Sequence, residues 1–151
     1  MHVVVATDGS RESLVAARYL TSFADPAKVT GITVVAVVRP LASVAFANDL
    51  SPQEKKTAGT ETGSFREAAN AAVGIVADAL RGWGPKVKTK VRSGSPASEI
   101  LKEAELTGAG LVVVSAGGRG LTDTVLVGST AQRVQHYAPC PVLVVRPGRK
   151  R

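Results

Sequence analysis

Short apolar runs alternate with amphipathic segments along most of the chain. Five such runs predict β-strands, at residues 3–7, 32–38, 87–92, 111–114 and 141–146. Apolar positions at helical spacing predict helices over 11–23, 64–80, 96–107 and 130–137. Each interval between strands is long enough for a crossover, so the strands are expected to run parallel. The pattern therefore predicts a three-layer α/β/α open sheet of five parallel strands and four helices, a Rossmann-like fold.

Several local signals mark where the helices begin and end. Ser10 is a predicted N-cap, and Ser95 followed by Pro96 forms a second helix start. Residues 64–67, Ser-Phe-Arg-Glu, have the form of a capping box, which predicts a helix beginning there. The preceding stretch, residues 41–63, contains glycine, proline and asparagine and is expected to be a long connection with at most a short helical piece.

Length and composition set the domain organisation. With 151 residues, 44% of them hydrophobic and 21% charged, the chain predicts one domain over residues 1–146 and a basic tail at 147–151. Cys140 is the single cysteine, so it is interpreted as a small buried residue in a turn. The amino terminus lacks the features of a signal peptide and the apolar runs are short, so a cytoplasmic location without membrane insertion is expected.

The formal net charge of +7 could indicate a protein that binds nucleic acid. Part of that charge comes from the carboxyl-terminal tail. Another part comes from the alternating stretch Lys86–Arg92, whose cations are interpreted as the solvated face of one strand. Aromatic residues that could stack on bases do not interleave with these cations. Nucleic acid is therefore not a predicted partner.

Glycines after the fourth predicted strand are the strongest candidate for chemistry. Gly117, Gly118 and Gly120 allow close backbone approach, and a loop of this kind can hold an anion. The sequence Gly128-Ser129-Thr130 then opens a helix, whose free N–H groups favour a phosphate. Ser129 can serve as N-cap, as phosphate ligand, or as both. Glycines in this position are also ordinary turns, so both interpretations stay open here.

Neither common phosphate-loop motif is present in the chain. The spacing instead resembles the universal stress protein family, over essentially the whole length from Val3 to Arg146. The nucleotide-binding branch of that family carries G-x-x-G, nine residues, and then G-[ST]. Gly118, nine residues, and Gly128-Ser129 match this motif, whereas Ser115 stands where the first glycine falls. The amino-terminal Val-Val-Ala-Thr-Asp-Gly-Ser and the carboxyl-terminal Ala-Pro-Cys-Pro-Val-Leu-Val-Val also match the family.

The resemblance implies a binding site for ATP or AMP with Mg²⁺, and a role for each matching residue. Asp8 matches the acidic residue near the ribose and the metal-bound phosphates. Val37 matches the residue whose backbone contacts adenine. The positions that match the lining of the ribose and phosphates are Val114, Ser115, Gly118, Gly128, Ser129 and Thr130. Serine at position 115 costs about 1 kcal/mol or more if the backbone there must adopt positive φ, and little otherwise. Asp8-Gly9-Ser10 is also a good turn and helix-start sequence.

Three functions remain open from the sequence. The first is a stress-response module that binds an adenine nucleotide and hydrolyses it slowly at most, because no general base is evident. The second is a protein of the same family that binds no nucleotide and acts through protein–protein contacts. The third is an adenylating enzyme of the related α-hydrolase superfamily, although residues 7–10 lack the paired glycines of those enzymes.

The last predicted strand also bears on assembly. Val142–Val145 is short and apolar, so a position at the edge of the sheet would leave it in need of a partner. The family resemblance implies a homodimer in which this strand pairs with its copy across a two-fold axis.

Overall fold

The computed structural model describes residues 1–40, 52–117, 128–146 and 148, and of residues 52–63 it describes the backbone alone. Five parallel strands form one sheet, and they are β1 (His2–Ala6), β2 (Gly31–Val38), β3 (Val87–Ser93), β4 (Leu111–Ser115) and β5 (Val142–Val145). The α-helices of the described residues are α1 (Arg11–Phe23), α2 (Pro52–Leu80), α3 (Pro96–Thr107) and α4 (Ser129–Tyr137). A 3-10 turn, η1 (Pro26–Lys28), precedes β2. The predicted three-layer fold is confirmed.

The strands lie in the order β3-β2-β1-β4-β5. The chain moves outward from β1 to β2 and β3, and α3 then carries it back to the other side of β1. The strand order therefore reverses between β1 and β4. In an open parallel sheet, ligands bind beyond the carboxyl ends of the strands at such a reversal.

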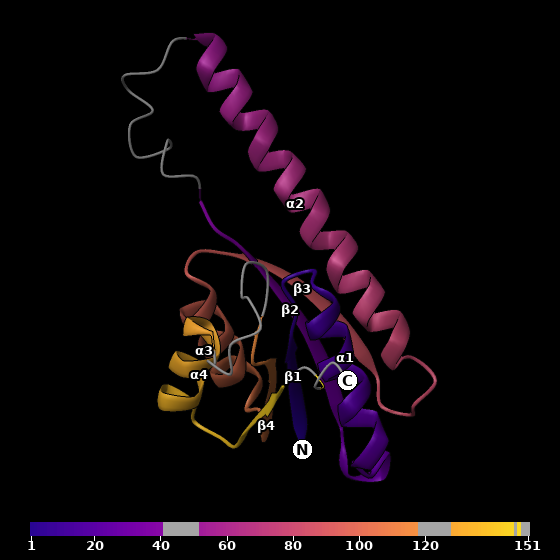
Figure 1. Cartoon of the computed structure of the whole chain (residues 1–151). Helices are drawn as coiled ribbons and strands as arrows, with labels where there is room; N and C mark the ends of the chain where they lie inside the picture. The colour runs from indigo at the N-terminus through magenta and orange to yellow at the C-terminus, as the bar shows by residue number, and fades with distance from the viewer. Residues whose placement is uncertain (41–51, 118–127, 147, 149–151) are drawn as a thin grey trace.

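Alternation of side chains along the strands separates two hydrophobic cores. Val3 and Val5 of β1 point into a cluster with α1 and α2, whereas Val4 and Ala6 point into a cluster with α3 and α4. Figure 1 shows the same division, with α1 and α2 on one side of the sheet and α3 and α4 on the other. Because β1, β2 and β4 are covered on both faces, their residues form near-continuous runs of valine and isoleucine.

The start of α2 differs from the prediction. The capping box at residues 64–67 predicts a helix start, but the helix already begins at Pro52, so this prediction is wrong. The predicted connection at 41–63 is consequently shortened, and residues 41–51 lie outside the described part. Glycine inside a helix costs about 1 kcal/mol relative to alanine. Ending one helix and nucleating another is unfavourable, so Gly59 and Gly63 do not interrupt it.

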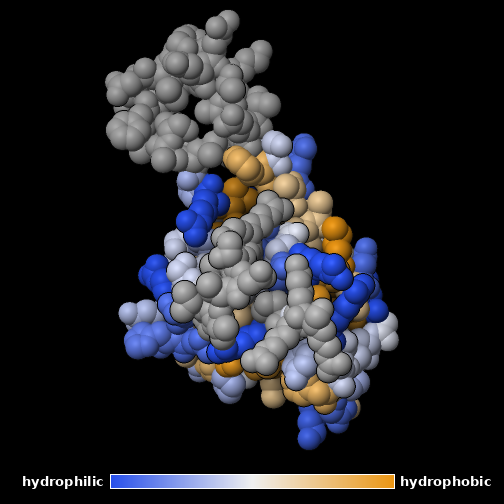
Figure 2. Space-filling view, in the orientation of Figure 1, coloured by the Kyte–Doolittle hydropathy of each residue, from blue (hydrophilic) through white to orange (hydrophobic). Residues whose placement is uncertain are grey.

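The length of α2 shapes the end of the molecule at which the strands have their carboxyl ends. Its 29 residues span about 44 Å, whereas the eight residues of β2 span about 26 Å. The amino-terminal part of α2 therefore extends past the carboxyl ends of the strands (Figure 1). Hydrophobic residues gather on the visible face where α2 leaves the sheet (Figure 2). Within the described residues, no helix is both long enough and apolar enough to cross a membrane.

Other local predictions have mixed outcomes. Ser10 is the N-cap of α1, and its hydroxyl accepts a hydrogen bond from the Ser13 amide at 3.2 Å, as predicted. Ser95 occupies the N-cap position of α3, but its side chain makes no capping hydrogen bond. The single tryptophan, Trp83, packs against the core under α1 and α2. Cys140 is half-buried, and burial raises the pKa of its thiol.

Candidate functional site

A cavity of about 500 Å³ lies at the carboxyl ends of β1, β2 and β4, where the strand order reverses. Cavities of roughly 300–1,000 Å³ with apolar walls and a few polar groups are typical of small-molecule sites. One wall is apolar and comes from the sheet and α3; it includes Val35, Val37, Ile100 and Val114. The polar groups come from the turn after β1, the end of β4 and the start of α4.

The turn between β1 and α1 presents Asp8 to the cavity. Asp8 Oδ1 accepts a hydrogen bond from the Ser10 amide at 2.9 Å, and Gly9 between them has a φ of 80°. Below it, Thr7 Oγ1 lies 2.7 Å from Ser13 Oγ and accepts from the Gly9 amide at 3.1 Å. Both anchoring hydroxyls are buried, so the turn is fixed to the first turn of α1. Asp8 therefore has the structural role that Asp-Gly-Ser predicts and also lines the cavity.

The end of β4 shows how serine fits at position 115. Ser115 is the last residue of β4, and its hydroxyl donates to the carbonyl oxygen of Gly117 at 2.8 Å. Within the described residues, positive φ is confined to glycines. The cost expected for serine in a left-handed conformation therefore does not arise, and Ser115 contributes a backbone and a hydroxyl to the cavity wall.

The amino terminus of α4 supplies the second polar side of the cavity. Gly128 is its N-cap, with φ of −60° and ψ of 155°, and Ser129 is the first helical residue, so Ser129 is not the N-cap. The Gly128 amide donates to the Ala116 carbonyl oxygen at 2.6 Å, which ties the start of α4 to the end of β4. A glycine cap has no side chain to accept hydrogen bonds from the first-turn amides. The positive end of the helix dipole at Ser129 and Thr130 thus faces the cavity.

The structure brings most of the predicted site residues together. Seven of the eight line the cavity, and they are Asp8, Val37, Val114, Ser115, Gly128, Ser129 and Thr130. The eighth, Gly118, lies outside the described residues. Sequence reasoning missed Arg39 and Ile100, which also line the cavity. The signal for Arg39 was its place one residue beyond the end of β2.

The charges around the cavity are few. Of the described residues that line it, Asp8 is the one carboxylate and Arg39 the one cation, and both are exposed. No group of three potential metal-ligating side chains is found in the described parts of the chain. Magnesium commonly binds through one or two carboxylates together with the phosphates of a nucleotide. Asp8 therefore fits a magnesium ion that arrives with a nucleotide, and it does not by itself make a protein metal site.

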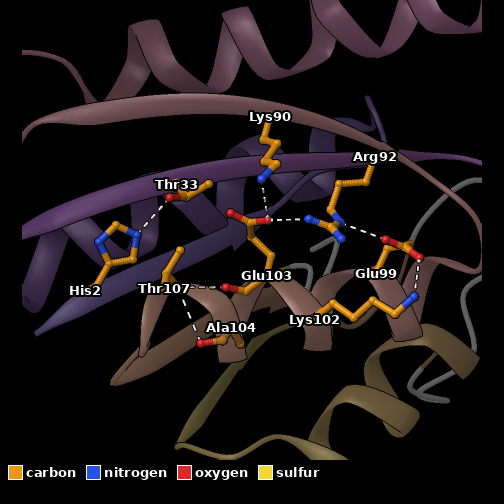
Figure 3. A network of polar contacts seen from close by, with 9 residues as sticks. All are labelled: His2, Thr33, Lys90, Arg92, Glu99, Lys102, Glu103, Ala104 and Thr107. Carbon is orange, nitrogen blue, oxygen red and sulfur yellow. Dashed lines mark hydrogen bonds and ion pairs between the residues drawn. The ribbon is translucent and has the colours of Figure 1, made fainter.

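A buried ionic network holds the wall formed by α3 (Figure 3). Arg92 of β3 donates from Nε to Glu99 Oε2 at 2.7 Å and from Nη1 to Glu103 Oε2 at 2.8 Å. Lys90 and Lys102 add contacts of 3.4 and 3.1 Å to the same carboxylates. The side chains of Glu99 and Glu103 are only 10% and 4% exposed. The prediction that Arg92 lies on a solvated face is therefore wrong.

This network explains two shifted pKa values. The hydrogen bond from Arg92 lowers the pKa of Glu99, and the hydrogen bond to Glu99 raises the pKa of Arg92. Nearby, His2 Nε2 lies 2.8 Å from Thr33 Oγ1, and burial lowers the pKa of the His2 imidazole. Glu99 lies one residue before Ile100, so the network fixes the position of the α3 residues that line the cavity.

A second, smaller hollow of about 360 Å³ lies against α2. It shares part of its lining with the first cavity, namely Thr7, Asp8, Val37 and Arg39. Its other walls are apolar and come from the opposite face of β2 and from the face of α2 that carries Phe65, Ala68, Ala69 and Ala72. The turn after β1 and the end of β2 thus stand between the two hollows.

The fold and the cavity define a doubly wound α/β protein with a cavity at its strand reversal. The family model of the universal stress protein family matches residues 1–146. The chain therefore belongs to the universal stress protein family. It is 34% identical over 151 residues to universal stress protein MJ0531 of Methanocaldococcus jannaschii, a match that covers 98% of this chain and 83% of the relative.

Solved structures agree on the fold. Universal stress protein UspA from Lactobacillus plantarum superposes with a TM-score of 0.80 at 24% identity, covering 97% of each chain. A universal stress protein in complex with cAMP superposes with a TM-score of 0.59 at 24% identity, covering 96% of each chain. The Arabidopsis thaliana family protein At3g01520 with AMP bound superposes with a TM-score of 0.64 at 15% identity, covering 98% of this chain and 92% of the other.

Proposed function

We propose that this chain binds an adenine nucleotide, ATP or AMP, in the 500 Å³ cavity and acts as a stress-response binding module. The observation that carries the proposal is the convergence of three segments distant in sequence. The Asp8 turn, the end of β4 and the first turn of α4 all line one cavity. Two family members with this fold are described with cAMP and AMP, which supports an adenine nucleotide as the ligand class.

The division of the cavity supports a particular orientation. The apolar wall at Val37 and Ile100 suits a base, whereas the amides of Ser129 and Thr130 suit phosphates. Gly118 is expected to contribute to the phosphate side, as its place in the family motif implies. Asp8 would hold the ribose or a magnesium ion bound by the phosphates. With Asp8 as the one carboxylate among the described lining residues, hydrolysis is expected to be slow at most.

Isothermal titration calorimetry tests the proposal, with ATP, AMP and cAMP each titrated with and without Mg²⁺. Saturation at 100 times the Kd stabilises the fold by about 2.7 kcal/mol, or roughly 5–10 °C in melting temperature for a chain of this size. Absence of heat, together with an unchanged melting temperature at millimolar nucleotide, contradicts nucleotide binding. It would leave the alternative of a family member that acts through protein contacts alone.

Two variants sharpen the test. Ser129→Glu places a negative charge at the first position of α4, which helix stability tolerates but a phosphate does not. Gln135→Glu adds the same charge near the other end of the same helix and serves as the matched control.

Asp8→Asn keeps the turn, because asparagine can accept the same hydrogen bond, and it removes the charge that magnesium requires. It should weaken binding of Mg-ATP more than binding of AMP.

Assembly as a homodimer forms part of the same proposal. The two edges of the sheet differ in charge, because β3 exposes Lys88 and Lys90 whereas β5 carries only valine and leucine. Lysines on an edge strand discourage pairing with other chains, and an uncharged apolar edge favours it. We therefore expect two copies to pair through Val142–Val145. The cytoplasmic location expected from the sequence also stays a prediction.

A further inference from the structure

Three exposed apolar side chains lie in a row along α1. Val15, Tyr19 and Phe23 are spaced four residues apart and are 41%, 51% and 59% exposed. The rings of Tyr19 and Phe23 have centroids 5.5 Å apart. Residues four apart are neighbours on one helix face, so the three side chains form a continuous strip, the α1 row. The outward face of a helix on a monomer is normally polar, which makes a continuous apolar strip informative.

The α1 row lies on the flank of α1 nearer to β5. The helix buries Ala16, Ala17 and Leu20 against the sheet, and one flank, at Leu14, packs partly into the core shared with α2. At 100° per residue the row falls on the opposite flank from Leu14. Helix α1 contacts β4 and β5 below it and has α2 beside it. The flank away from α2 therefore looks toward the side of β5.

The edge of β5 continues this apolar surface. Val142, Leu143 and Val144 are only half-buried, and β5 has no described neighbour beyond it in the sheet. Leu143 packs into the core cluster to which α1 belongs, so it lies on the α1 side of the sheet. The α1 row and the outer edge of β5 are consequently adjacent parts of one surface.

Two-fold symmetry indicates that a second copy of this chain covers the surface. Antiparallel pairing of β5 with a second β5 requires a two-fold axis perpendicular to the sheet. That axis keeps both α1 helices on the same face and turns their rows toward each other. With strands about 4.8 Å apart and α1 above β4 and β5, the two helix axes lie roughly 10–14 Å apart. Helices in contact pack at about 8–10 Å, so large side chains are needed to fill the gap.

We propose that the α1 row is the second contact surface of a two-fold dimer of this chain, facing the same row of the partner copy. The inference rests on the proposed pairing of β5 but goes beyond it. A stable interface buries about 1,200–2,000 Å² in total, which a four-residue strand edge supplies only in part. A fully buried Tyr or Phe removes about 150–250 Å², so the half-exposed rings of two copies add about 400 Å².

Sedimentation velocity over a concentration series tests the α1 row directly. Tyr19→Arg places two like charges at the meeting of the rows and should raise the dimer dissociation constant on the order of 100-fold. Leu106→Arg, at a side chain that is 71% exposed on α3, is the matched control and should leave it unchanged. In a Cys140→Ser background, Tyr19→Cys should form a dimer with a short bis-maleimide, whereas Leu106→Cys should not.

The outcomes separate this inference from the nucleotide proposal. If Tyr19→Arg sediments as the wild-type dimer, the α1 row is not an interface, and pairing through β5 alone stands. A wild-type chain that is monomeric at about 100 μM overturns both the row and the β5 pairing. Nucleotide titrations of the Tyr19→Arg variant should match the wild type, because Tyr19 does not line the cavity.

Discussion

The buried network between β3 and α3 makes a quantitative prediction about the Arg92→Met variant. Methionine keeps most of the length of the side chain but removes the cation shared by Glu99 and Glu103. Removing one partner of a buried ion pair typically costs about 3–5 kcal/mol, because the other charge is left uncompensated. Lys90 and Lys102 still reach the two carboxylates, so we expect a loss at the lower end, about 3 kcal/mol.

Urea unfolding followed by the fluorescence of Trp83, the single tryptophan, measures this loss. A loss of about 3 kcal/mol corresponds to a fall in melting temperature of roughly 6–12 °C for a domain of this size. The control is Arg81→Met, since Arg81 pairs with Asp78 and both side chains are largely exposed. Exposed pairs contribute about 0–1 kcal/mol, so this variant should stay close to the wild type.

The pH dependence of the free energy of unfolding gives a second test of the same network. The pKa of Glu99 is lowered in the folded protein, so its interaction stabilises the wild type above the ordinary glutamate pKa. That contribution is lost as the pH falls through the lowered value. In Arg92→Met the Glu99 carboxylate loses the hydrogen bond that lowers its pKa and takes up a proton more readily, so the deficit should shrink between pH 7 and about pH 4. A deficit below 1 kcal/mol, or one that grows on acidification, would refute the reasoning.

Three further predictions concern single positions. Gly94→Ala should lower the free energy of unfolding in urea by about 2 kcal/mol or more, because the φ of Gly94 is 142° and a Cβ would lie 2.9 Å from Glu99 Oε1. The control, Gly74→Ala, has open space around it inside α2 and should raise the free energy of unfolding by roughly 0.5–1 kcal/mol. Equal effects of the two substitutions would contradict this prediction. Ser10→Ala should cost about 1 kcal/mol through loss of the α1 cap, and an unchanged unfolding midpoint would count against the cap. Cys140 should react with iodoacetamide at pH 8 more slowly than glutathione does, because its raised pKa leaves less thiolate, and a faster reaction would show the opposite.

Hydrophobic periodicity was sufficient to predict the layers of the fold. Valine-rich runs alternating with amphipathic segments allow few arrangements other than a parallel sheet covered on both faces. The start of α2 could not be predicted in this way. Its first residues lack a clear apolar stripe, and a capping box at 64–67 is a stronger local signal than a polar helix that continues through two glycines.

The candidate site was predictable in part for a related reason. Asp8 follows a strand, Ser115 ends one and Gly128 caps a helix, and in this fold such positions converge at one end of the sheet. Arg39 follows β2 and was open to the same rule, whereas Ile100 lines the cavity because α3 lies beside it, which depends on packing. The role of Arg92 could not be predicted from the sequence. Alternation along β3 shows which face of the sheet Arg92 occupies, but it does not show that Glu99 and Glu103 of α3 lie on the same face.

The wall between the two hollows belongs to both of them. Asp8, Val37 and Arg39 contribute to the lining of both, with one hollow on the α3 side of the sheet and the other against α2. A ligand in one hollow that displaced these residues would change the affinity of the other hollow for its own ligand. Thermodynamic reciprocity requires the two effects to be equal in free energy. Any coupling between a ligand at the strand reversal and the long helix would therefore pass through the short turn after β1 and the end of β2.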